Sequence, residues 1–82
     1  MNSGDIVKEA MKSMGWTQKT LAKQMGYLDK DGEGMQTAVG NRLSGNKMLV
    51  GTFVKFLDAM GYELVVRSSN PNANKNEWKV SE

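Results

Sequence analysis

Apolar residues recur at helical spacing at both ends of the first sixty residues of this chain. Near the N-terminus, over residues 5–14, the apolar stripe consists of Ile6, Val7, Ala10, Met11 and Met14. Over residues 46–61, it consists of Val50, Phe53, Phe56, Leu57 and Met60. Stripes of this kind predict two amphipathic helices, each ended by a glycine, Gly15 and Gly61 respectively.

Between these two helices the pattern predicts a pair of shorter ones. Thr17 is a favoured helix N-cap, and Trp16 and Leu21 have the spacing of a hydrophobic staple. Gly26 can adopt positive φ, so it is expected to end this helix. The next helix is expected to start at about Gln36 and to stop at Gly45.

This second short helix has a narrow apolar stripe and a wide polar face. Only Val39 and Leu43, spaced four apart, are clear apolar anchors. The polar positions include Gln36, Asn41 and Arg42, whose side-chain types pair with adenine and guanine edges in the major groove of DNA. Two short helices around a polar turn have the layout of a helix-turn-helix, which places its second helix in that groove.

The turn at residues 27–35 is nine residues long and contains three acids, Asp29, Asp31 and Glu33. Its start is similar to that of a calcium-binding loop. An EF-hand, however, needs a bidentate glutamate at the twelfth position, which is Gly40 when counted from Asp29. We therefore expect an inserted, solvated loop and no calcium site. Because DNA phosphates would repel its three carboxylates, the loop is expected to point away from them.

After Tyr62 the helical pattern stops. Residues 63–67 are rich in β-branched side chains, and residues 77–81 alternate polar and apolar positions around Trp78 and Val80. The polar run at 68–76 reads as a loop, so the pattern predicts a β-hairpin. An isolated hairpin is marginally stable and needs a partner surface, either the helical core or the same hairpin of a second copy. A disordered tail from Ser68 is the alternative, which the apolar Trp78 and Val80 disfavour.

Composition narrows the classes of function. The chain of 82 residues contains no cysteine and no histidine, which excludes disulfides and thiolate or imidazole metal ligands and removes the commonest general base. The net charge is only +2. Residues 16–48 nevertheless contain five basic residues, and their three acids all lie in the turn. The two central helices therefore lack negative charge, as a phosphate-binding surface requires.

The central residues resemble the lambda repressor and Cro (Xre-type) helix-turn-helix family, and the resemblance covers roughly residues 5–62. The matching positions are Thr17, Gln18, Leu21, Ala22, Met25, Gly26, Gln36, Thr37, Val39, Gly40, Leu43, Ser44, Gly45 and residues 57–62. The turn at 27–35 departs from the family, whose connection is only a few residues long. The resemblance implies a mainly α fold: a lambda repressor-like helix-turn-helix bundle of about four helices, here with a C-terminal β-hairpin.

Roles for individual residues follow from matching positions in the family. Gln36 matches a position that reads bases, Thr37 matches a serine that does likewise, and Asn41 replaces a small residue on the same face. Gln18 matches a glutamine that holds a phosphate. Further expected phosphate contacts are Lys19, Lys23, Arg42, Ser44 and Lys47, although each lysine has a plain solvated charge as its alternative, as has Arg42. Leu21, Ala22, Val39 and Leu43 are assigned to the helix–helix contact.

The sequence thus predicts a DNA-binding domain at 1–62 and a dimerisation hairpin at 63–82, with Leu64, Val66, Trp78 and Val80 as dimer contacts. The expected protein is a sequence-specific transcriptional regulator, most simply a repressor, acting as a homodimer on a palindromic site in double-stranded DNA. The alternative is a protein-interaction module on the same scaffold, either an antitoxin that masks a toxin or a phage protein that binds a host protein. No catalytic constellation, cofactor or metal site is expected. No long apolar run begins the chain, so a cytoplasmic protein is expected.

Overall fold

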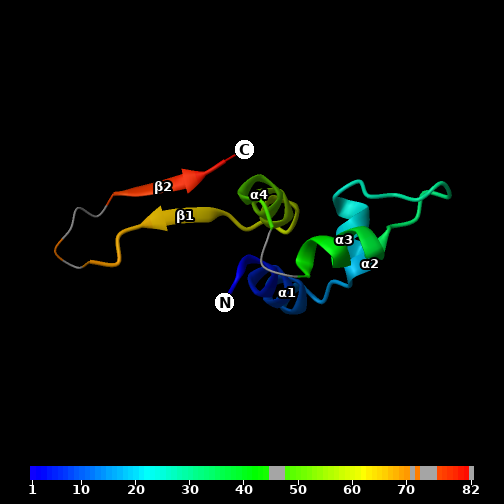
Figure 1. Cartoon of the computed structure of the whole chain (residues 1–82), viewed down its shortest axis with the longest axis horizontal. Coiled ribbons are helices and arrows are strands. Elements are labelled where there is room, and N and C mark those ends of the chain that lie inside the picture. Colours follow the sequence, from blue (N-terminus) through cyan, green and yellow to red (C-terminus); the bar gives the residue numbers. More distant parts are fainter. Residues whose placement is uncertain (45–47, 71, 73–75, 82) are drawn as a thin grey trace.

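The computed structural model describes residues 1–44, 48–70, 72 and 76–81. Within these residues the chain forms four helices and two strands (Figure 1): α1 (Ser3–Met14), α2 (Gln18–Gln24), α3 (Gln36–Leu43), α4 (Val50–Ala59), β1 (Leu64–Arg67) and β2 (Glu77–Val80). The strands pair as an antiparallel hairpin. A mainly helical fold with a C-terminal hairpin is therefore confirmed.

Helix α1 begins two residues earlier than the apolar stripe predicts. Asn2 is its N-cap, and the Asn2 side chain accepts a hydrogen bond of 2.9 Å from the backbone N–H of Asp5. The Asp5 carboxylate in turn accepts a bond of 3.3 Å from the backbone N–H of Asn2. This reciprocal capping box satisfies two N–H groups at the helix start, and it explains why the helix includes polar residues that periodicity alone leaves out.

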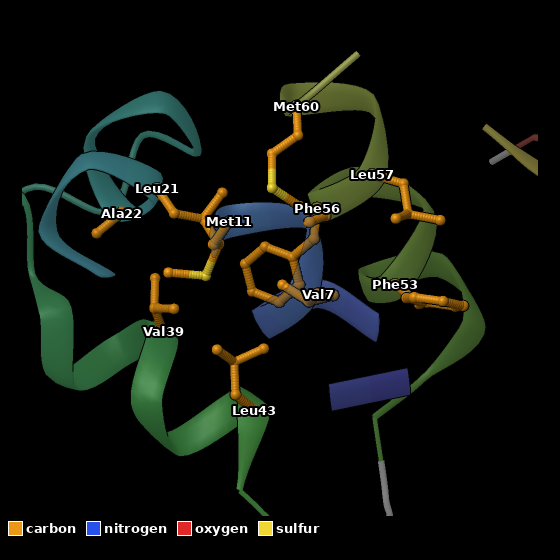
Figure 2. Packing of buried hydrophobic residues seen from close by; sticks show 11 residues of the cluster. Val7, Met11, Leu21, Ala22, Val39, Leu43, Phe53, Phe56, Leu57 and Met60 are labelled. Atoms are coloured by element: carbon orange, nitrogen blue, oxygen red, sulfur yellow. The ribbon is translucent and has the colours of Figure 1, made fainter. Parts of the chain in front are cut away.

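One hydrophobic core joins the four helices. Figure 2 shows the Phe56 ring of α4 at its centre, with Val7 and Met11 of α1, Leu21 of α2, and Val39 and Leu43 of α3 around it. Phe56, Leu21, Val7 and Val39 are fully buried. The core thus fixes α3 by two side chains only, as its narrow apolar stripe predicted.

Three positions of the predicted apolar stripes are exposed in the structure. Helix α4 starts at Val50 rather than at 46, with the extended Leu49 as N-cap. Val50, in the first turn, is consequently 62% exposed, while Val54, one turn later, is buried. Ile6 and Met14 of α1 are also exposed, because α3 and α4 cover only the Val7, Ala10 and Met11 side of that helix.

The hairpin extends away from the helices. Figure 1 shows β1 and β2 at one end of the molecule and α2 with α3 at the other, and the overall dimensions are 53 × 23 × 21 Å. Leu64, at the start of β1, packs against the core. The rest of the hairpin projects beyond it, so among the described residues the helical core covers only its base.

The turn at 27–35, called the acidic turn below, is more ordered than a plain solvated insertion. A β-bridge joins Leu28 and Gly34, and the N–H of Met35 donates a bond of 2.7 Å to the carbonyl of Tyr27. The Asp29 carboxylate accepts bonds from the N–H groups of Asp31 (2.8 Å) and Glu33 (3.0 Å). The acidic turn is therefore a miniature hairpin held by an aspartate, a known turn-forming use of that residue.

No helix in the described part of the chain has the length and apolar content that spanning a bilayer requires.

Candidate nucleic-acid interface

Helices α2 and α3 pack against each other and expose polar side chains beyond their contact. Thr17 caps α2 as predicted, its hydroxyl accepting a 3.1 Å bond from the N–H of Thr20. Leu21 and Ala22 of α2, with Val39 and Leu43 of α3, are buried in the core. These four residues were assigned to the helix–helix contact, and their burial agrees with that assignment.

Helix α3 presents the three residues that the sequence singled out for base contacts. Gln36, Thr37 and Asn41 are all exposed, with Gln36 at the first helical position. Thr37 and Asn41 are four residues apart and therefore lie on the same side of the helix. This surface is uncharged and carries amide and hydroxyl groups, which donate and accept hydrogen bonds to the edges of bases.

The Gln18 side chain crosses from α2 to α3 at a glycine. A Cβ added to Gly40 would lie 3.2 Å from Gln18 Oε1, so the mid-helix glycine makes room for this amide. A glycine inside a helix costs about 1 kcal/mol relative to alanine. At Gly40 the space that the missing side chain leaves is occupied by Gln18, which therefore lies next to the exposed face of α3.

The basic side chains on α2 differ in their surroundings. Lys19 Nζ lies 3.3 Å from the Glu33 carboxylate of the acidic turn, and both side chains are exposed. Lys23, in the last turn of α2, is exposed too. The acidic turn was expected to point away from phosphate contacts, yet Glu33 lies beside one of the lysines proposed to make them.

Arg42 is exposed, but its guanidinium makes two contacts within the protein. Its guanidinium lies over the Tyr27 ring, 4.5 Å from the ring centroid, and Nη1 donates a 2.9 Å bond to the carbonyl of Ala38. Tyr27 is half-buried and makes an edge contact with Phe56, with ring centroids 6.4 Å apart. Sequence reasoning missed Tyr27, although a tyrosine directly after a helix-ending glycine is a signal of docking onto the core.

Ser44 ends α3, and its hydroxyl donates a 3.2 Å bond to the carbonyl of Asn41. Lys47, the remaining expected phosphate contact, lies outside the described residues. A hollow of about 430 Å³ follows the end of α3, lined by Asn41, Arg42, Ser44, Met48, Leu49 and Thr52. Met48 and Leu49 precede α4 in the structure, whereas the sequence pattern had assigned them to the helix at 46–61; Thr52 lies in the first turn of α4.

The four residues predicted for dimerisation share one face of the hairpin. Leu64 pairs with Val80, and Val66 pairs with Trp78. Directly opposed residues of an antiparallel pair point to the same side, and so do residues two apart in a strand. Val66 is 51% and Trp78 62% exposed, whereas Leu64 and Val80 are half-buried, so the described residues leave the Val66–Trp78 part of this face uncovered.

Comparisons of the chain with family models, with curated proteins and with solved structures gave no match.

Proposed function

We propose that this protein is a sequence-specific DNA-binding regulator of transcription with a lambda repressor-like helix-turn-helix, formed by α2 and α3. The observation that carries the proposal is the exposed polar face of α3 next to a basic α2. Val39 and Leu43 anchor α3, which leaves Gln36, Thr37 and Asn41 available for base edges. Neither helix contains an acid that would repel phosphates.

The two helices have different roles in binding: α3 contacts bases and α2 contacts phosphates. Helix α3 enters the major groove, where Gln36 recognises a base and Thr37 and Asn41 contact neighbouring edges. Gln18, Lys19 and Lys23 of α2, with Ser44 and Lys47 after α3, contact phosphates and hold the orientation of α3. The Arg42 guanidinium lies over Tyr27 and donates one N–H to the Ala38 carbonyl, so its phosphate contact uses the remaining N–H groups.

The hairpin joins two copies. Its apolar face, on which Val66 and Trp78 are exposed and Leu64 and Val80 are half-buried, is the kind of surface that a second subunit buries. A two-fold dimer would present two α3 helices to a palindrome, with half-sites one helical turn or a multiple of it apart. We propose repression by occupancy of such an operator.

A second candidate function is a protein-interaction module on the same scaffold, such as an antitoxin that covers a toxin. The observation that favours it is again the exposed hairpin, because Trp78 and Val66 would fit an apolar groove of another protein as well as a second copy. An acidic turn beside α2 also suits a protein partner better than DNA.

Selection from a pool of random duplexes at near-physiological salt tests the first proposal against the second. Enrichment of a palindrome supports a dimeric DNA-binding regulator, and the half-site spacing gives the geometry of the dimer. A folded protein that enriches no sequence contradicts it and favours the interaction module. Circular dichroism of the same sample establishes that the protein is folded.

A further inference from the structure

The acidic turn is fixed against the helix that is proposed to contact phosphates. A Cβ on Gly34 would overlap the carbonyl oxygen of Lys19 and would lie 3.1 Å from the backbone nitrogen of Lys23. The backbone of the acidic turn therefore touches the backbone of α2. At the start of the turn, Tyr27 contacts Phe56 in the core and Arg42 on α3. Contacts at both ends hold the turn in place.

This placement sets a carboxylate beside one of the α2 lysines. Glu33 Oε2 lies 3.3 Å from Lys19 Nζ, and the side chains are 61% and 57% exposed. An ion pair so exposed to solvent contributes little to folding stability. Its effect on DNA binding is larger than its effect on folding, because DNA carries closely spaced negative charges along its axis. A carboxylate near the contact surface repels these phosphates and weakens binding.

We propose that Glu33 limits the affinity of this protein for DNA by competing with phosphate for the Lys19 ammonium. This inference rests on the proposed DNA-binding function of α2 and α3. A phosphate reaches Lys19 either by displacing Glu33 or by approaching a lysine whose charge is already compensated. In both cases the carboxylate weakens binding to every duplex, whatever its sequence, because phosphates carry no sequence information. The acidic turn is then an element that keeps binding to non-operator DNA low.

The size of the effect follows from its exposure. Removing one exposed opposing charge next to a phosphate contact should tighten binding about two- to fivefold at near-physiological salt. The logarithmic dependence of affinity on salt should become steeper by up to about one unit, because Lys19 then releases a counterion from DNA that it does not release when Glu33 compensates it.

The experiment compares the full chain with Glu33→Gln on two probes, the duplex enriched by selection and an unselected duplex of equal length. Binding is titrated at several salt concentrations. The matched control is Glu63→Gln: Glu63 pairs with Lys79 at 3.7 Å, with both side chains 60% exposed. Glu63 directly precedes β1, which Figure 1 shows on the opposite side of the helices from the acidic turn. Because Glu63 borders the hairpin that is proposed to join two copies, light scattering checks that this control keeps the oligomeric state of the wild type. Both variants raise the net charge by one. Tighter DNA binding by Glu33→Gln alone would therefore show that the position of the carboxylate matters and not only the net charge of the protein.

A second pair of variants identifies the partner. In a Lys19→Gln background, Glu33→Gln should no longer tighten binding, because the side chain through which Glu33 acts is gone. The proposal is overturned if Glu33→Gln binds like the wild-type protein, if it binds more weakly, if Glu63→Gln gains as much, or if the gain persists without Lys19. Wild-type protein that binds neither duplex instead overturns the proposed DNA-binding function, and this inference with it. Urea unfolding of each variant checks that its fold is unchanged.

Discussion

Two helical glycines lie against another helix, but they face different kinds of atom. A Cβ on Gly4 of α1 would lie 2.5 Å from the carbonyl oxygen of Leu43, which is backbone and cannot rotate aside. A Cβ on Gly40 of α3 would lie 3.2 Å from Gln18 Oε1, the far end of an exposed, flexible side chain. The same substitution should therefore have opposite effects at the two positions.

Gly4→Ala should lower the free energy of unfolding by about 1–3 kcal/mol, because it overpacks the contact between α1 and α3. Gly40→Ala should raise it by up to about 1 kcal/mol, because alanine favours the helix and Gln18 can move. Urea unfolding of both variants measures the two changes. A Gly4→Ala protein as stable as the wild type would mean that α1 shifts freely over the end of α3.

Base and phosphate contacts should respond differently to truncation. On the selected duplex, Gln36→Ala should cost roughly 1–3 kcal/mol and relax specificity at one base pair. Lys23→Ala should weaken binding to all duplexes alike and flatten the salt dependence by about one unit. Titrations on the selected duplex and on its single-base variants separate the two cases. If Gln36→Ala binds every duplex as the wild type does, α3 is not the recognition helix.

At the scale of the element, the acidic turn depends on one carboxylate. Asp29 Oδ1 accepts hydrogen bonds from two backbone N–H groups, those of Asp31 and Glu33. Asp29→Ala should therefore cost about 1–2 kcal/mol of stability, whereas Asp29→Asn, which keeps an acceptor oxygen, should cost less than half of that. Denaturant midpoints provide the measurement. Equal losses in both variants would show that the charge of Asp29, not its acceptor atom, organises the turn.

Local signals in the sequence identified most elements but not all of their limits. Thr17 and the Val39–Leu43 pair were sufficient to predict α2 and α3, because a cap and an i, i+4 contact are local. The start of α4 was predicted too early, and the predicted apolar stripe included the exposed Val50 and omitted the buried Val54. The spacing of apolar residues predicts which face of a helix is buried. It does not predict the residue at which the helix begins, because that residue depends on packing with other helices.

Part of the candidate site was visible in the sequence. Gln36, Thr37 and Asn41 lie on a polar face of a short helix, and the structure shows them exposed, while their base contacts stay predictions. The contacts Tyr27–Arg42 and Glu33–Lys19 were not, since each joins residues fourteen or more positions apart through the seating of the acidic turn. The turn takes this position because the backbone at Gly34 lies against the backbone of α2. No local sequence pattern predicts this contact.

For the whole molecule, dimerisation through the hairpin predicts a difference between two adjacent valines. Val66 lies on the apolar face with Trp78, whereas Val65 lies on the other face, opposite Lys79. If that apolar face is the dimer contact, Val66→Ser should weaken dimerisation at least tenfold and Trp78→Ser more, since a buried interface tryptophan commonly contributes 2 kcal/mol or more.

Val65→Ser is the control, because it makes the same chemical change in the same strand on the opposite face. Light scattering across a range of protein concentrations measures the dissociation constant, and circular dichroism verifies that helix content is retained. Dimers of equal strength in Val66→Ser and Val65→Ser would place the contact elsewhere on the molecule.

The hairpin has only two strands, so within the described residues each strand has one edge without a neighbouring strand. Backbone amides that point outward along these edges are open to water and exchange their protons rapidly with solvent. Subunits that joined edge to edge would form a continuous four-stranded sheet and protect the amides of one edge in each copy. Subunits that packed through the face of Val66 and Trp78 would leave the outward-pointing amides of both edges unprotected. Proton exchange of the backbone amides of β1 and β2 therefore distinguishes a dimer that pairs strand edges from a dimer that packs hairpin faces.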